Sequence, residues 1–277
     1  MNKPIELNKD EASYLMGAAE PPTSSVLISN SKYLNNPLFR DIYAQFGLKR
    51  DGHDLPAAYL IPELSRAFGE VTDYGKVFEA LAEERARIPE FAEWLDARYL
   101  SNFTAELVEG SAPGTLGALI YDFVAKSGMA IDFMYKDAPQ NDFDYLVKRR
   151  VQNHDIEHMV TGLDASPVGE IGLIVANTIA NDNYFQGELL RELNAYGSIL
   201  ISTSVSRAGL HYPAVLPTLL EAMARGHALG AKQKKPFFMI RWEDYLDWQI
   251  AEIREEFHFE DGPEAGAWEW TFEAFRG

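Results

Sequence analysis

A long helix with a sharply marked end is the most restrictive pattern in this chain. Helical periodicity runs from about Phe143 to Thr161 and stops at Gly162, the residue type that most readily adopts the left-handed conformation just past a helix C-terminus. Ser166-Pro167 then has the form of an N-cap residue followed by proline at the first helical position. Because only a few residues separate the two helices, the sequence predicts an αα-hairpin here.

Helical periodicity also dominates the rest of the chain. Apolar residues recur at helical spacing from Pro62 onward, and the strand-like runs at 199–201 and 237–240 are short. Further helices are expected over 184–196, 213–229 and 242–257. We therefore predict an all-α, mainly helical fold, arranged as one compact multi-helix domain over residues 1–277.

The charge balance argues against several kinds of partner. The chain has 25 Lys plus Arg against 42 Asp plus Glu, a net charge of −17, whereas nucleic-acid binding depends on cations that neutralise phosphates. No uncharged apolar run approaches the roughly 18 residues of a membrane-spanning helix. No secretory or transit pattern is recognisable at the N-terminus. We expect no nucleic-acid partner, no membrane span and a cytoplasmic location.

Two histidines provide a candidate metal site. His154 and His158 are four residues apart, so they stack on one face of the predicted 143–161 helix. The chain has no cysteine, so any metal ligands must be His, Asp or Glu. Asp155 is a third ligand or a partner that orients a histidine, and Glu170 would reach the same point if the hairpin closes. We predict that His154, Asp155, His158 and Glu170 bind one divalent cation, with Asp155 or Glu170 moving a proton.

This ligand set leaves several chemistries open. Imidazole nitrogens with carboxylate oxygens suit Zn, which we favour, and also Fe, Mn or Co, with Mg as a further alternative. The spacing resembles the zinc-protease helix, but Asp155 stands where such proteases have a longer catalytic Glu. A phosphohydrolase of the HD type would need ligands on other helices, for which His53 and Asp182 are only loose candidates. Two histidines at this spacing also occur without any metal, exposed or hydrogen-bonded in a core.

Taken together, these residues resemble the ubiquinone (coenzyme Q) biosynthesis protein 4 family. His154-Asp155-x-x-His158, then eleven residues, then Glu170 matches its HDxxHx11E signature. Other segments similar to the family are Pro113-Gly114-Thr115-Leu116-Gly117 with Tyr121 and Phe123, Asp132, Tyr145, Arg149, Thr161-Gly162, Gly169-Glu170, Trp242-Glu243 and 252–256. The resemblance covers about 110–257. Val151-Gln152 stands where the family usually has Arg-Glu, so we expect a divergent bacterial member.

The resemblance implies a helical protein that works at the membrane surface, here the inner face, and binds polyprenyl or prenylquinone lipids. It implies metal-dependent oxidative decarboxylation of a prenylated benzoquinone precursor. The alternative is a non-catalytic polyprenyl-lipid-binding scaffold for other quinone biosynthesis proteins, so whether the chain is an enzyme stays open, as does a homodimer. On this basis we divide the chain into an N-terminal helical subregion 1–110, a core 111–257 and an aromatic-acidic tail 258–277.

Two apolar stripes are candidates for contact with a polyprenyl tail. They comprise Leu116, Leu119, Ile120, Phe123, Leu173 and Ile174. Leu173 and Ile174 follow Glu170 on one predicted helix, so a tail could lead away from the cation while its ring reaches it. Each buried CH₂ group contributes roughly 0.8 kcal/mol to such binding. The alternative is that both stripes simply pack together as core.

Overall fold

The described part of the chain is helical. The computed structural model describes residues 31–49, 60–100, 103–127, 137–259 and 262–275, with Lys9, Ala12, Ser13, Met16 and Gly17 near the N-terminus. Its elements are α2 (Lys32–Asn35), α3 (Pro37–Leu48), α4 (Ile61–Val71), α5 (Tyr74–Arg87), α6 (Pro89–Ala97), α7 (Ala105–Val108), α8 (Leu116–Ser127), α9 (Asp142–Thr161), α10 (Pro167–Asp182), α11 (Gly187–His211), α12 (Leu216–Lys232), the 3₁₀ turns η3 (Phe237–Met239) and η4 (Trp242–Tyr245), α13 (Ile250–Glu256) and α14 (Trp270–Ala274). Within these residues the only β-type pairing is an isolated bridge, so the all-α prediction is confirmed.

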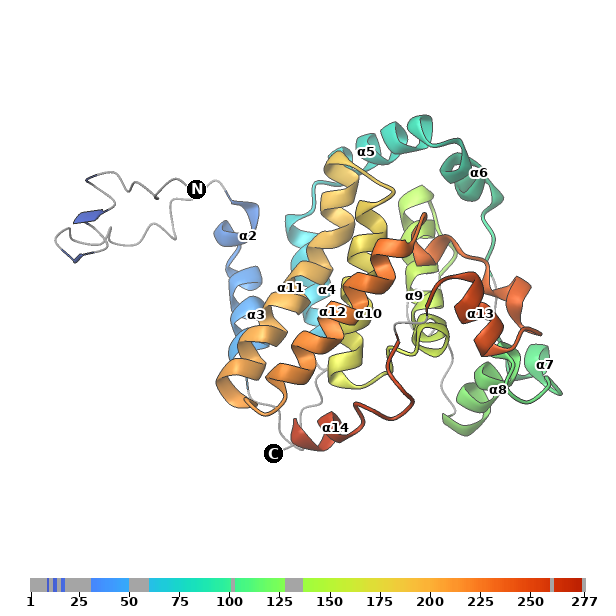
Figure 1. Ribbon diagram of the computed structural model, residues 1–277. Helices are drawn as coiled ribbons and strands as arrows, with labels where there is room; N and C mark the ends of the chain where they lie inside the picture. The colour runs from blue at the N-terminus through green and yellow to red at the C-terminus, as the bar shows by residue number, and fades with distance from the viewer. Residues whose placement is uncertain are drawn as a thin grey trace, which may run out of the picture.

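Helices α10, α11 and α12 form the centre of the molecule (Figure 1). The closest approach is between α10 and α12, where a Cβ atom on Gly226 would lie 2.0 Å from the backbone oxygen of Gly172. The two backbones can touch only because both positions lack a side chain. Around this contact lies the largest apolar cluster, which extends to α8, α9 and the C-terminal segment.

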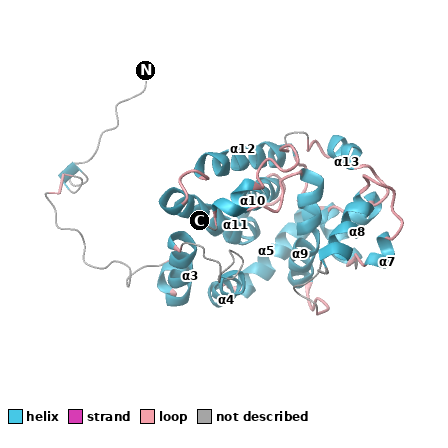
Figure 2. Cartoon of the chain, turned by 90° about the horizontal axis from the view of Figure 1, so that it is seen from below, coloured by secondary structure: helices cyan, strands magenta, loops and turns pink. Residues whose placement is uncertain are grey.

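The other helices surround this centre. Seen from below, α3 and α4 lie at one end and α7 and α8 at the other (Figure 2). Phe39, Ile42 and Leu64 of α3 and α4 pack against α11 in a second apolar cluster. In the tail, Trp268 and Phe275 are buried against the body, whereas Trp270 and Phe272 stay exposed. None of the described helices is long and apolar enough to cross a membrane.

Three expected segments differ from the structure. The run 199–201 lies inside α11, which extends well beyond the expected 184–196, and 237–239 is a 3₁₀ turn. The expected helix 242–257 is divided into η4 and α13. The backbone between them pairs with the start of α8: Leu116 N–H donates to Trp248 O at 3.0 Å, and Gly117 N–H donates to Leu246 O at 2.8 Å. The carbonyl oxygens of Leu246 and Trp248 therefore accept hydrogen bonds from α8. They are not used to continue a helix in their own segment, which interrupts the expected helix.

Candidate metal centre

The helix that carries both histidines ends where the sequence predicts. Gly162 follows α9 with a φ of +77°, and its N–H donates to His158 O at 3.1 Å. Ser166 caps α10, because its Oγ accepts a hydrogen bond from Gly169 N–H at 3.1 Å. These local signals confirm the predicted helix–turn–helix unit and put Glu170 in the first turn of α10.

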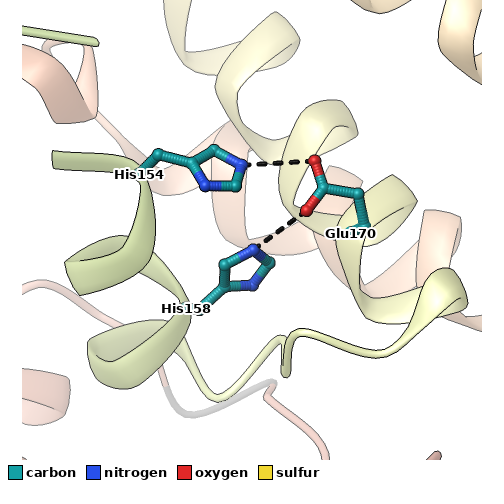
Figure 3. Close-up of side chains that lie close together, drawn as sticks. All are labelled: His154, His158 and Glu170. Carbon is teal, nitrogen blue, oxygen red and sulfur yellow. Dashed lines mark hydrogen bonds and ion pairs between the residues drawn. The ribbon is translucent and has the colours of Figure 1, made fainter. Parts of the chain in front are cut away.

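Three side chains of this unit converge on one point (Figure 3). Nε2 of His154 lies 3.2 Å from Oε1 of Glu170, and Nε2 of His158 lies 3.0 Å from Oε2 of the same carboxylate. The two imidazole rings are 4.8 Å apart and almost perpendicular, at 86°. One potential ligand atom from each residue lies within 4.8 Å of the others.

A second contact orients each imidazole. Nδ1 of His158 lies 2.5 Å from the carbonyl oxygen of Leu163, so that nitrogen must carry the proton and donate it. This leaves the lone pair of Nε2 facing Glu170 in the neutral ring. In His154, Nδ1 makes a longer contact of 3.4 Å with Oδ1 of Asp155. Metal-binding histidines characteristically have such an outer partner on the second ring nitrogen.

The charges in this group are strongly coupled. Burial alone would raise the pKa of Glu170, but the charges and hydrogen bonds of His154 and His158 hold that pKa well below its usual range. Burial works against protonation of His154, yet the charge of Glu170 and the hydrogen bonds with Asp155 and Glu170 raise the pKa of His154 well above its ordinary value. Protonation of His154 and ionisation of Glu170 therefore favour each other in this arrangement.

The donor set suits a divalent ion that keeps some coordination positions free of protein ligands. Two imidazole nitrogens and one carboxylate are three protein ligands, the number typical of catalytic rather than structural zinc sites. Bonds of about 2.1 Å would require only small side-chain shifts from the present spacing. His154 and Glu170 keep 38% and 37% of their side-chain surface exposed, whereas His158 keeps 8%. Substrate or water can therefore approach from the side of His154 and Glu170.

Asp155 occupies a different place from the other three predicted ligands. It contacts Nδ1 of His154, on the opposite edge of the ring from Glu170. Within the described residues, the group that faces one point comprises His154, His158 and Glu170. The position of Asp155 is that of an orienting partner, the second of the two roles that the sequence left open.

The sequence did not single out the buried Glu157–Asn177 contact beside the centre. Glu157 is 2% exposed, and its carboxylate accepts a hydrogen bond of 2.7 Å from Nδ2 of Asn177 on α10. Burial raises the pKa of Glu157, which the hydrogen bond from Asn177 partly offsets. Glu157 follows His154 by three residues on the same helix, so the sequence puts it near the histidines. Nothing in the sequence pairs it with Asn177.

A buried ion pair fixes the other side of α9. Nη1 of Arg149 lies 3.1 Å from Oε1 of Glu243, and these side chains are 1% and 6% exposed. Nη2 of Arg149 donates to Ile240 O at 3.1 Å, and Nδ2 of Asn153 donates to the same oxygen at 3.2 Å. The resemblance had marked Arg149 and Glu243 separately, and their pairing across the fold required the structure.

The six candidate lipid contacts divide into three groups. Leu116, Ile120 and Leu173 are fully buried in the central cluster, and Phe123 and Ile174 pack against it half-buried. Leu119 is 36% exposed. The most exposed member of the set, Leu119, therefore lies on α8.

The other sequence candidate that the structure describes, Asp182, lies away from the three converging side chains. Asp182 is exposed at the C-terminal end of α10, about 18 Å along the helix from Glu170 at 1.5 Å per residue, so it cannot join the histidines. His53 and the Asp132 of the resemblance lie outside the described residues.

Comparisons with known proteins bear on this arrangement. The family model of the coenzyme Q (ubiquinone) biosynthesis protein Coq4 matches residues 67–263, well over half of the chain and all three converging side chains. Among curated proteins, none matched the chain. A crystal structure of a Nostoc punctiforme protein, named for a proposed role in ubiquinone biosynthesis, is similar in fold with a TM-score of 0.60. It is 24% identical in sequence, and the match covers 82% of this chain and 99% of that one.

Proposed function

The chain belongs to the coenzyme Q (ubiquinone) biosynthesis protein Coq4 family, and from that premise we propose that it acts in ubiquinone biosynthesis through a divalent metal ion. The ion would be held by His154, His158 and Glu170. The observation that carries this proposal is the convergence of the three side chains, with each imidazole oriented by a second contact. A hydrogen-bonded second nitrogen is what a metal-binding histidine requires to present the other one.

The substrate that we propose is a prenylated ring acid with a hydroxyl group opposite its carboxyl group. When bound, a divalent ion supplies Lewis-acid and template chemistry for the oxygen atoms of such a ring. In this proposal Asp155 or Glu170 takes up or returns a proton, because both contact His154 and Glu170 is partly exposed. His158 is nearly inaccessible, and its role in this proposal is to hold the ion in place.

The proposed reaction is an oxidative decarboxylation with dioxygen as the oxidant. The bond between the ring and its carboxyl carbon breaks, and that carbon leaves as CO₂. One oxygen atom of dioxygen forms the new bond to the ring carbon, and the other leaves as water. The ring supplies all four electrons and both protons, so the product is the quinone and no further reductant is needed.

We place the polyprenyl tail along α8. Leu119 is the accessible member of the predicted set, and Phe123 lies one turn further along the same face. A tail there would remain in contact with apolar side chains while the ring enters from the exposed side of Glu170. Leu119→Lys is expected to reduce the isoprenoid recovered by lipid extraction. Leu107→Lys, an exposed leucine on α7, is the matched control.

One observation favours the scaffold alternative. The imidazoles of His154 and His158 already contact both oxygens of Glu170 directly, at 3.2 and 3.0 Å. If each imidazole carries a proton on Nε2, hydrogen bonds to Glu170 alone would hold the turn, and a protein of this shape could bind prenylated lipids and other proteins without chemistry. Metal content and turnover separate the two functions.

The test combines elemental analysis with a substrate assay. Protein purified without chelator should contain a divalent metal, His158→Ala should lose it, and His227→Ala on an exposed face of α12 should retain it. Wild-type protein should convert a prenylated 4-hydroxybenzoate-type acid with release of CO₂. In a deletion strain, His158→Ala should accumulate the ring acid if the protein is the enzyme. Normal quinone levels with this variant would support the scaffold, and unchanged metal content in His158→Ala would reject the metal centre.

A further inference from the structure

The end of the histidine helix is held by a residue from a distant part of the chain. Arg254 lies on α13, and its Nε–H donates to the carbonyl oxygen of Val160 at 2.9 Å. Val160 is in the last turn of α9, where carbonyl oxygens have no partner within the helix. A cation at this position also interacts favourably with the helix dipole.

The same guanidinium covers the turn that follows. A Cβ atom on Gly162 would lie 2.8 Å from Nη2 of Arg254. Gly162 has a φ of +77°, so this position disfavours a side chain for reasons of backbone conformation as well as space. One planar group thus contacts both the last turn of α9 and the residue that ends it.

Among the described residues, Arg254 has no acidic partner that would explain its position. Although the protein is strongly acidic, the ion pairs formed among the described residues do not include Arg254. Burial without a compensating carboxylate lowers the pKa of Arg254. The contacts made by its guanidinium are therefore directed at the backbone of the turn.

This turn also sets the orientation of His158. Gly162 N–H donates to His158 O, and Leu163 O accepts the hydrogen bond from Nδ1 of the same residue. A displacement of the turn would move the acceptor that holds the imidazole, and with it the direction of Nε2. The sequence of contacts runs from Arg254 through Val160 and Gly162 to Leu163 and His158.

We propose that Arg254 is a positioning residue of the metal centre, which fixes the 160–163 turn so that His158 presents Nε2 toward Glu170. This inference rests on the proposed function, because it assigns Arg254 to the same three ligands. The contacts of Arg254 are to the backbone of the turn and not to the side chains of His154, His158 or Glu170, so it acts through the turn.

The test measures Co²⁺ affinity and the visible spectrum of the bound ion in Arg254→Gln and Arg254→Lys. Changes in outer partners of metal ligands typically cost 10–100-fold in affinity, so Arg254→Gln should weaken Co²⁺ binding by about 10-fold or more. Arg254→Lys retains a charge and a donor for Val160 O but cannot also cover Gly162, and should fall between wild type and Arg254→Gln.

The matched control is Asn183→Ala. Nδ2 of Asn183 donates to Gly230 O and Gln233 O at the end of α12, so this variant also removes a side-chain cap from a helix C-terminus. It should lower the unfolding temperature and leave the Co²⁺ affinity and spectrum unchanged. If Arg254→Gln lowers the unfolding temperature but binds Co²⁺ as wild type does, Arg254 is only a structural residue and the inference is overturned.

A second measurement keeps the inference separate from the proposed function. Nitrogen NMR of the metal-free protein, at a pH where His158 is neutral, should show its proton on Nδ1 in the wild type and a mixture of tautomers in Arg254→Gln. If the wild type binds no Co²⁺, the proposed function fails, and the tautomer still decides whether Arg254 positions His158. An unchanged tautomer in Arg254→Gln would then overturn the inference as well.

Discussion

In the proposed metal centre, a proton and a metal ion would compete for His154. The pKa of His154 is raised in the metal-free protein by Glu170 and Asp155, which outweigh the effect of burial. Its protonated form therefore stabilises the fold fully below the unfolded pKa of about 6.5, and this contribution is lost as the pH rises through the folded pKa. The lowered pKa of Glu170 acts in the other direction, because its contribution is present above about pH 4.3 and is lost on acidification.

The effect of metal on stability should therefore increase with pH. Above about pH 6.5 the metal-free protein progressively loses the contribution of protonated His154, while metal binding has fewer protons to displace. We expect the difference in unfolding temperature between Co²⁺-loaded and metal-free protein to be larger at pH 8 than at pH 6. Thermal unfolding at both pH values measures it, with His158→Ala as the control. A difference that stays constant or shrinks would contradict the competition.

Asp155 can be tested as an orienting residue. Asp155 contacts Nδ1 of His154. We therefore expect Asp155→Asn, which keeps an acceptor oxygen, to lower metal affinity by about 10-fold. The number of metal ions bound and the spectrum of bound Co²⁺ should stay the same. A changed Co²⁺ spectrum would instead identify Asp155 as a ligand.

At the scale of the helices, two caps allow a matched comparison. Oγ of Ser166 accepts from Gly169 N–H at the start of α10, and Oδ1 of Asn141 accepts from Asp144 N–H at the start of α9. Loss of either cap should cost about 1 kcal/mol of unfolding free energy. Because Ser166 begins the turn of helix that carries Glu170, only Ser166→Ala should also weaken metal binding. Urea unfolding and Co²⁺ titration of Ser166→Ala and Asn141→Ala test this, and equal affinities would show that the cap of α10 does not position Glu170.

The helix boundaries show what local sequence can predict. The end of α9 and the start of α10 were correct because Gly162 and Ser166 form their hydrogen bonds within a few residues. The break between η4 and α13 was missed because it depends on α8, more than a hundred positions earlier in the chain. The convergence of His154, His158 and Glu170 followed from the helix–turn–helix pattern alone, whereas the contacts of Arg254 could not, since nothing local marks which helix end it caps.

At the scale of the whole molecule, the contact between α10 and α12 limits which substitutions the core accepts. A Cβ atom on Gly226 would clash with backbone rather than with a flexible side chain, so Gly226→Ala should destabilise the protein by about 3 kcal/mol or more. Gly209→Ala on α11 is the control, because the nearest atom to its Cβ would be 4.0 Å away, on the side chain of Leu216 at the start of α12. That helical substitution should stabilise by about 0.5–1 kcal/mol. Urea unfolding of both variants measures the difference, and similar free energies would refute the close packing.

The contacts around α9 also imply an order in time. His154, His158 and Glu170 leave the ribosome within one short stretch of synthesis, yet the groups that immobilise α9, the helix of both histidines, come from Ile240, Glu243 and Arg254. A growing chain therefore holds all three converging side chains while the partners that fix α9 are still untranslated. Any metal selectivity of these side chains would belong to the finished polypeptide, in which their positions are fixed.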